Sequence, residues 1–180
     1  MNLFVKTASV LCLTLMMFVG ALMNNATAQV SGKAFEGFQG SSKDPVQIEA
    51  DQLEVLDEQS RAIFQGNVKV RQGTSLITTS KLVVKYKKNA NTGGQGDIQQ
   101  LDMSGGLIAT SKENTVTADQ GTYFVDTEQI ILTGKKVVIS QGDNVAVGTK
   151  LVANLKTNKA VLSGGRVKSV FTPGSQKKTN

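Results

Sequence analysis

Residues 63–73 have the sequence IFQGNVKVRQG, and residues 132–142 have the sequence LTGKKVVISQG. In both stretches apolar residues alternate with polar ones around a glycine, Gly66 in the first and Gly134 in the second. Period-two alternation over four to eight residues is typical of half-buried antiparallel strands, and glycine between such runs is a turn signal. Each stretch is therefore predicted to be a β-hairpin that ends on a Gln-Gly turn.

The two stretches belong to a longer internal repeat. The tripeptide ADQ at 50–52 recurs at 118–120, an offset of 68 (118 − 50), and Gly66 recurs as Gly134 at the same offset. After this glycine the offset becomes 69, because GKK in the second copy replaces GN in the first. A partial third copy follows at 162–170. Repeated supersecondary units that stack on one another build elongated sheets.

The rest of the chain between Pro45 and Pro173 also has the pattern of strands. VQIEA (46–50) and TYFVD (122–126) alternate, and no proline interrupts the region. Residues 80–89 and 149–158 have some helical spacing, but they lack a capping box and are predicted as strands. Frequent turn signals divide the region into roughly 12–16 short strands, which predicts an all-β sandwich, jelly-roll or solenoid.

The N-terminal 28 residues are predicted to be a cleaved secretory signal peptide. Lys6 precedes an apolar run from about Val10 to Met23, and Ala26-Thr27-Ala28 has the small-x-small pattern of a cleavage site. An uncleaved membrane anchor is the alternative. Cleavage would leave 180 − 28 = 152 residues. Residues 29–43 are predicted to be a flexible lead-in, and residues 174–180 a disordered basic tail.

The composition excludes several kinds of chemistry. The chain has no histidine, and its one cysteine, Cys12, lies in the predicted signal peptide. The mature chain therefore has no Ser-His or Cys-His nucleophile, and it lacks the preferred ligands of zinc. No cofactor, no metal and no catalytic residue is expected. The net charge of +6, about +5 without Lys6, suits anionic partners in general.

Several polar residues are predicted to have structural roles. Asp51 and Asp119 could be taken for a carboxylate pair, but aspartate more often binds nearby backbone amides in turns. Four glycines are expected to supply positive φ at hairpin turns: Gly66, Gly73, Gly134 and Gly142. A lysine cluster is predicted to form a solvated face: Lys81, Lys85, Lys87 and Lys88. The predicted core is Leu53, Val55, Phe64, Val68, Val70, Leu132, Val137 and Ile139.

Five segments in register resemble the LptA/OstA family of periplasmic lipopolysaccharide-transport proteins. They are DPVQIEAD, FQGNVKVRQG followed by LITTSKLVV, TADQGTYF, ILTGKKVVISQGDNVAVGTKLV and GGRVKSVFTP. The resemblance covers residues 44–173. It implies a β-jellyroll of antiparallel strands folded into a twisted, V-shaped slot with an apolar interior.

The resemblance also implies a function and partners. Members of the family carry lipopolysaccharide across the periplasm, with the acyl chains of its lipid A moiety in the apolar groove. They receive it through LptC and pass it to LptD, and copies stack end to end through their edge strands. Neither catalysis nor a cofactor nor nucleic acid is implied. An LptC-like membrane-anchored subunit and a structural β-solenoid that binds no lipid are the alternatives.

The expected groove-lining residues lie on three of the predicted strands. Val46 and Ile48 share a face of the first strand after Pro45, and resemble the lipid-lining N-terminal strand of the family. Tyr123 and Val125 share a face of a later strand, and the Tyr123 hydroxyl could contact a polar headgroup. Leu107 is a further candidate. Because any β-sandwich core uses the same residue types, alternation alone does not separate lining from core.

Overall fold

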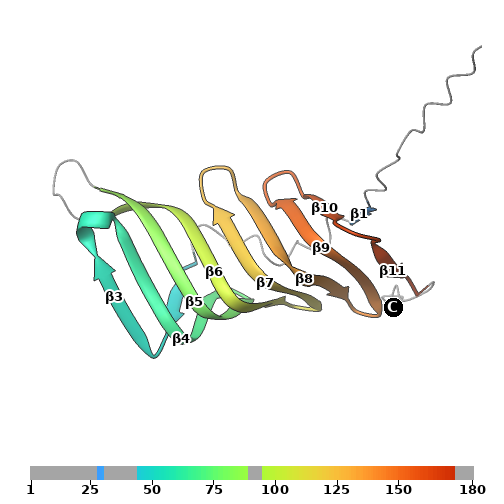
Figure 1. Ribbon diagram of the computed structural model, residues 1–180, viewed down its shortest axis with the longest axis horizontal. Helices are drawn as coiled ribbons and strands as arrows, with labels where there is room; N and C mark the ends of the chain where they lie inside the picture. Colours follow the sequence, from blue (N-terminus) through green and yellow to red (C-terminus); the bar gives the residue numbers. More distant parts are fainter. Residues whose placement is uncertain (1–27, 31–43, 89–94, 173–180) are drawn as a thin grey trace, which may run out of the picture.

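The computed structural model describes residues 28–30, 44–88 and 95–172, which form one antiparallel sheet (Figure 1). The strands are β1 (Ala28–Val30), β2 (Gln47–Glu49), β3 (Gln52–Leu56), β4 (Arg61–Gln72), β5 (Ser75–Lys88), β6 (Gln95–Ser111), β7 (Asn114–Phe124), β8 (Gln129–Gln141), β9 (Asn144–Asn154), β10 (Lys159–Ser163) and β11 (Lys168–Val170). A single-turn 3-10 helix, η2 (Asp57–Gln59), joins β3 to β4. The all-β prediction is confirmed.

Six long strands, β4 to β9, follow one another as consecutive hairpins and form the middle of the sheet. At one end, β4 pairs with β2 over residues 69–71 and with β3 over residues 61–65. At the other end, β9 pairs with β10 over residues 150–154 and with β11 over residues 145–147. Each end of the sheet is therefore a strand in two pieces, interrupted at the same level.

That level is a line of register shifts across the whole sheet. The register shifts between Gln65 and Val68 in β4, between Ser104 and Leu107 in β6, and between Thr133 and Val137 in β8. β-Bulges bend a strand and increase its twist. These bulges divide the sheet into two halves (Figure 1). We call the upper half the part whose hairpins turn at residues 57–60, 125–128 and 155–158. The lower half is the part whose hairpins turn at residues 73–74, 112–113 and 142–143.

The prediction that 63–73 and 132–142 are hairpins is wrong. Residues 61–72 are the single strand β4 and residues 129–141 the single strand β8, so Gly66 and Gly134 lie at bends inside strands. Between Pro45 and Pro173, where 12–16 short strands were predicted, the described residues form ten strands, β2 to β11, six of them with 11–17 residues. Residues 80–88 and 149–154 are strands as expected.

Positive φ is confirmed for three of the four predicted glycines: Gly66 (+77°), Gly73 (+55°) and Gly142 (+54°). Gly134 does not have positive φ. The extra residue of the GKK segment leaves three residues between Thr133 and Val137, so the bend needs no left-handed residue there. Gly134 is instead required for close approach, since a Cβ on it would lie 2.8 Å from the Asp119 backbone nitrogen.

The two aspartates of the repeated ADQ hold these bends. Asp119 Oδ2 accepts a hydrogen bond from the Lys135 backbone N–H at 2.7 Å, as predicted for an aspartate that binds nearby backbone amides. Asp51 Oδ2 instead accepts from the Asn67 side-chain amide at 2.9 Å, while the Asp51 N–H donates to the Gly66 carbonyl. The internal repeat of the sequence therefore corresponds to a bend that occurs twice in the sheet, in β4 and in β8.

The core lies between the two halves, on the inner faces of the sheet. Val68, Val137 and Leu151 are fully buried, and the cluster continues through every strand from β4 to β10. Leu53 and Val55 were predicted to be core residues, but they are 54% and 46% exposed. Both lie on β3, at the end of the sheet, where no further strand of the described residues covers them.

Part of the segment expected to be a flexible lead-in is paired. Ala28–Val30 forms β1, which adds antiparallel to β10 with Gln29 opposite Val161. The rest of the lead-in, the signal peptide up to residue 27 and the tail after residue 172 lie outside the described residues.

Candidate functional site

The inner face of the upper half is apolar across seven strands. The row nearest the bend consists of the register partners Phe64, Leu82, Met103, Gly121, Leu132, Leu151 and Leu162. The next row, nearer the hairpin tips, consists of Ala62, Val84, Leu101, Tyr123, Ile130, Ala153 and Ala160.

The inner face of the lower half is equally apolar near the bend. Its first row consists of Val68, Thr79, Leu107, Ala118, Val137 and Gly148, and its second of Val70, Ile77, Ala109, Val116, Ile139 and Ala146. The one polar member, Thr79, donates its hydroxyl hydrogen to the Ser104 carbonyl at 2.9 Å. The only polar side chain in these two rows of the lower half is therefore hydrogen-bonded within the protein.

The two halves are in contact at the bend and open away from it. A Cβ on Gly121 of the upper half would lie 3.0 Å from Leu107 Cδ1 of the lower half, so this region has no spare space. Toward the tips, Leu101, Tyr123 and Ile130 of the upper half are only partly buried, and so are Val70 and Ile77 of the lower half, whose row is otherwise buried. The halves thus enclose an apolar trough, closed at the bend and accessible between the tips.

The predicted lining residues occupy different places in this trough. Ile48 lies on β2, pairs with Val70 and packs partly buried against the core; Tyr123 lies on the inner face of β7. Leu107 faces inward but is almost completely buried at the bend. Val46 precedes β2 and is 51% exposed, and Val125 follows β7, where its N–H donates to the Gln99 carbonyl.

Sequence reasoning missed the central part of the accessible surface. Leu101 and Ile130 flank Tyr123 on the neighbouring strands and share its exposure. Alternation was the available signal for Ile130, but its neighbour Ile131 is also apolar, so the pattern does not say which of the two faces inward. Only the pairing of Ile130 with Tyr123 shows that Ile130, and not Ile131, faces inward.

Tyr123 is a neutral phenol inside the mouth of the trough. Burial raises the pKa of its hydroxyl above the ordinary value, and the nearby Glu128 carboxylate raises that pKa further. Both effects disfavour the charged form, so the hydroxyl can donate and accept hydrogen bonds at neutral pH. An aromatic ring with a polar end suits the boundary between acyl chains and a polar headgroup.

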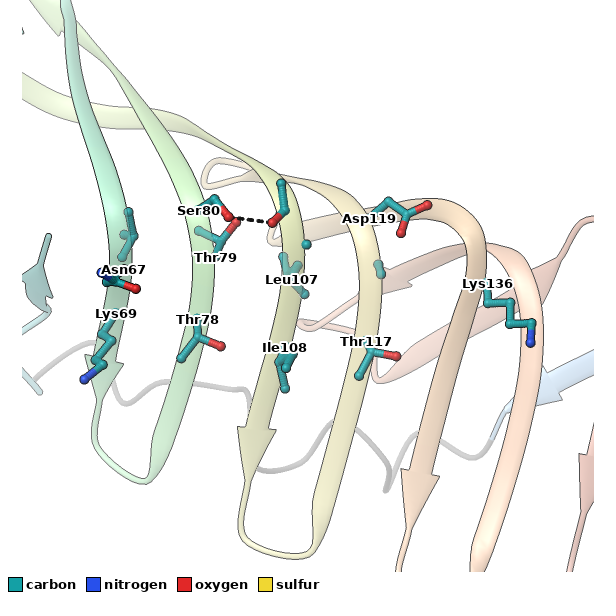
Figure 2. Close-up of a pocket in the computed structure, with 14 residues that line it drawn as sticks. Asn67, Lys69, Thr78, Thr79, Ser80, Leu107, Ile108, Thr117, Asp119 and Lys136 are labelled. Carbon is teal, nitrogen blue, oxygen red and sulfur yellow. Dashed lines mark hydrogen bonds between the residues drawn. The ribbon is translucent and has the colours of Figure 1, made fainter. Parts of the chain in front are cut away.

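A second hollow, of about 510 Å³, lies at the bend on the outer side of the lower half (Figure 2). Its exposed lining comes from the face opposite to Leu107, with Ile108 in the middle and Lys69 and Lys136 on strands β4 and β8. Its polar groups are engaged in holding the bends: the Ser80 hydroxyl donates to the Gly105 carbonyl at 2.6 Å, and Asp119 accepts from Lys135. No set of polar groups converges on one point, so the hollow is a weaker candidate than the trough.

The predicted lysine face is partly neutralised. Lys85 Nζ lies 2.8 Å from Asp102 Oδ2 on the outer face of the upper half. Partial burial acts to raise the pKa of Asp102, but hydrogen bonds from Lys85, Gln100 and Thr122 outweigh it and lower that pKa. Lys87 approaches Asp126 at 3.9 Å, a weaker and more exposed pair. These pairs stabilise the outer surface and do not reach the trough.

Within residues 28–30, 44–88 and 95–172, no group of three or more carboxylate, histidine or cysteine side chains is placed to hold a metal ion. In the same part of the chain, no helix has the length and hydropathy needed to cross a bilayer.

The fold defines a class of protein: a β-jellyroll whose two halves enclose an apolar trough. The crystal structure of LptH, the LptA-homologous periplasmic component of the lipopolysaccharide transport device of Pseudomonas aeruginosa, superposes with a TM-score of 0.61. The match covers 73% of this chain and 97% of that one at 21% identity, which establishes the β-jellyroll fold.

Sequence comparison places the chain in a family. Residues 47–159 match the family described as LptA/(LptD N-terminal domain) LPS transport protein, and the chain belongs to that family. An uncharacterized protein of Rhizobium meliloti (strain 1021) is 39% identical over 156 residues, 84% of each chain. The lipopolysaccharide export system protein LptH of P. aeruginosa is 27% identical over 152 residues, which cover 81% of this chain and 82% of LptH.

Proposed function

We propose that this protein binds lipopolysaccharide in the periplasm and carries it from the inner-membrane complex to the outer-membrane assembly site. The observation that carries the proposal is the trough: the inner face is apolar from β4 to β10 in the upper half and from β4 to β9 in the lower half, and these faces open between the tips. Membership of a family of lipopolysaccharide transport proteins supports lipopolysaccharide as the lipid. No catalytic step is part of the proposal.

The trough has the chemistry that acyl chains need. Each methylene transferred from water to an apolar environment contributes roughly 0.8 kcal/mol, so several acyl chains would bind strongly without any specific polar contact. The predicted lining residues Val46, Ile48, Leu107, Tyr123 and Val125 remain our proposed lining, with Leu101 and Ile130 added. Of these, Tyr123 and Ile130 combine an inward position with access from the mouth.

Photo-crosslinking tests this proposal directly. A photoreactive phenylalanine in place of Tyr123 is expected to capture lipopolysaccharide in cells, because the ring lies on the inner face. The matched control replaces Phe124, an equally half-buried aromatic residue on the outer face of the same strand. Capture at Phe124 but not at Tyr123 would show that the lipid does not lie in the trough.

Both ends of the sheet are suited to strand addition, which supports end-to-end stacking of copies and pairing with LptC and LptD. β2 and β3 each pair only with β4 among the described residues, and exposed Val46, Leu53 and Val55 lie beside this edge. At the other end, Val170 and Phe171 are 65% and 70% exposed at and just after β11. Exposed strand edges with apolar flanks are templates for pairing with another chain.

β1 covers part of one of these edges. It pairs with β10, so the upper half of this end is already occupied by the chain's own N-terminal segment. The 14 Cα–Cα steps from Val30 to Asp44 can extend about 48 Å, more than the roughly 38 Å that eight strand spacings from β1 to β2 require. The segment can therefore pair within its own molecule.

A mature chain shortened to begin at Asp44 is expected to associate end to end more strongly than one that begins at Gln29. Loss of the pairing of Gln29 and Val30 exposes β10, and the hydrogen bonds regained by a partner strand suggest about a tenfold higher association constant. Sedimentation velocity over a concentration series measures this. Equal or weaker association of the shortened chain would mean that β1 does not compete with a partner. Mass spectrometry of the protein isolated from cells shows where the mature chain begins, and we expect this residue to be Gln29.

A further inference from the structure

The two rims of the trough differ in chemistry. At the tips of the lower half, one cross-strand row consists only of uncharged amides and hydroxyls, and each member pairs with the next in register. We call it the amide–hydroxyl row: Gln72, Ser75, Ser111, Asn114, Gln141 and Asn144.

The row faces the interior of the trough. Its members alternate in phase with buried residues of the same strands: Ser111 lies two positions from Ala109, and Gln141 two positions from Ile139. Side chains two positions apart lie on the same face of a strand. Ser111 and Asn114, in the middle of the row, are themselves buried, so the row is the last inward layer before solvent.

The rim of the upper half is different. At its tips, buried Tyr86 and Leu155 and half-buried Val125 lie beside polar residues: their backbone N–H groups donate to the carbonyls of Ser60, Glu128 and Gln99. Both rims lie beside hairpin turns, so the need for polar residues near turns does not by itself explain why only the lower rim is amide and hydroxyl throughout. The lower rim is therefore neutral and polar throughout, whereas the upper rim mixes apolar residues with polar ones, including the charged Glu128.

We propose that the amide–hydroxyl row contacts the sugar hydroxyls and amides of a glycolipid whose acyl chains lie deeper in the trough. This inference rests on the proposed function and specifies which rim meets the headgroup. A sugar presents many neutral donors and acceptors, and amide side chains, with both a donor and an acceptor end, match them. The row contains no charged residue, so its chemistry selects the sugar rather than the phosphate groups attached to it.

The geometry agrees with this assignment. Ser75 Oγ and Thr74 Oγ1 lie 3.3 and 3.4 Å from Ser111 Oγ, at the long end of the hydrogen-bond range, and the Gln72 amide donates to the Asp44 carbonyl at 3.2 Å, so the members of the row already bind hydroxyl and carbonyl oxygens. Gln141 lies between Asn114 and Asn144 and is half-buried, which leaves part of its amide accessible from the mouth.

The test compares two lipids on two variants. The probes are lipid A, an acylated and phosphorylated glucosamine disaccharide, and dioleoyl phosphatidylglycerol, which has acyl chains and a phosphate but no sugar. The double variant Ser75→Ala/Gln141→Leu is expected to bind lipid A about tenfold more weakly and phosphatidylglycerol within twofold of the wild type, because only sugar hydrogen bonds are lost. Gln129→Leu, on the outer face of β8, is the matched control and should change neither affinity.

Each other outcome has a definite meaning. An equal change for both lipids, or no change for either, would overturn the role of the row while leaving the trough intact. Dephosphorylated lipid A should show the same tenfold loss; if the loss disappears, the row binds phosphate and the proposal is wrong. If the wild type binds neither lipid, the proposed function itself fails. Thermal unfolding of each variant verifies that the fold is retained.

Discussion

The Ile130→Asp variant is expected to lose lipopolysaccharide affinity by at least about tenfold. Ile130 lies on the inner face of β8, between Tyr123 and Ala153, and is partly exposed to the mouth of the trough. A carboxylate there would have to give up its hydration beside acyl chains, which costs several kcal/mol per ion, and 1.4 kcal/mol already corresponds to a tenfold change. The measurement is a binding titration with purified lipopolysaccharide.

The next residue of the same strand provides the control. Ile131 pairs with Thr122 and Val152 on the outer face, so Ile131→Asp should leave the affinity within about twofold. Both substitutions change the same residue type in the same way, and they differ only in the face of the sheet. An equal loss in both variants would mean that the outer face binds the lipid or that the strand is disrupted. Circular dichroism and thermal unfolding distinguish lipid binding on the outer face from disruption of the strand.

The Leu151→Ala variant is expected to lower the free energy of unfolding by about 3–5 kcal/mol. Leu151 is fully buried at the bend, where it lies between Leu132 and Leu162 in the row that joins the halves. The loss combines the transfer energy of the deleted atoms with a cavity between β8 and β10, which are held by backbone pairing on either side of Leu151 and cannot collapse fully to fill it. Urea unfolding followed by circular dichroism measures it.

The matched control is Leu53→Ala, on the end strand β3. Leu53 is 54% exposed, so its truncation should cost less than about 1 kcal/mol in the isolated protein. If partners pair with this edge, Leu53→Ala should instead weaken association. Similar losses of stability for the two variants would show that the bend row is no more tightly packed than the edge.

Much of the fold could be predicted from the sequence. Alternation such as Val68-Lys69-Val70 identified strands, and they are strands. Turn chemistry at Gln72-Gly73 and Gln141-Gly142 identified real hairpin ends, with positive φ at both glycines. The error concerned Gly66 and Gly134. A glycine between two apolar runs has the same local pattern at a hairpin and at a bulge, and only pairing with Asp51 or Asp119 distinguishes the two.

The candidate site was predicted less completely. Ile48 and Tyr123 could be proposed because each is an apolar or aromatic residue in an alternating run, and both face inward. Leu107 faces inward too, but lies where the halves close, whereas Leu101 and Ile130 lie where they open. The distance of a residue from the bend decides whether its side chain is accessible in the trough. That distance depends on which residues of neighbouring strands are register partners.

The sequence by itself determined that the chain is all-β, that it repeats, that it has no histidine and a single cysteine, and which family it resembles. These properties follow from residue type and spacing, which are local. The tertiary structure decided that the repeat is a bend rather than a hairpin, that bends in register form a trough, and that one rim of this trough is polar. Those properties depend on the register of strands, because the hydrogen bonds that fix the register join residues far apart in the chain.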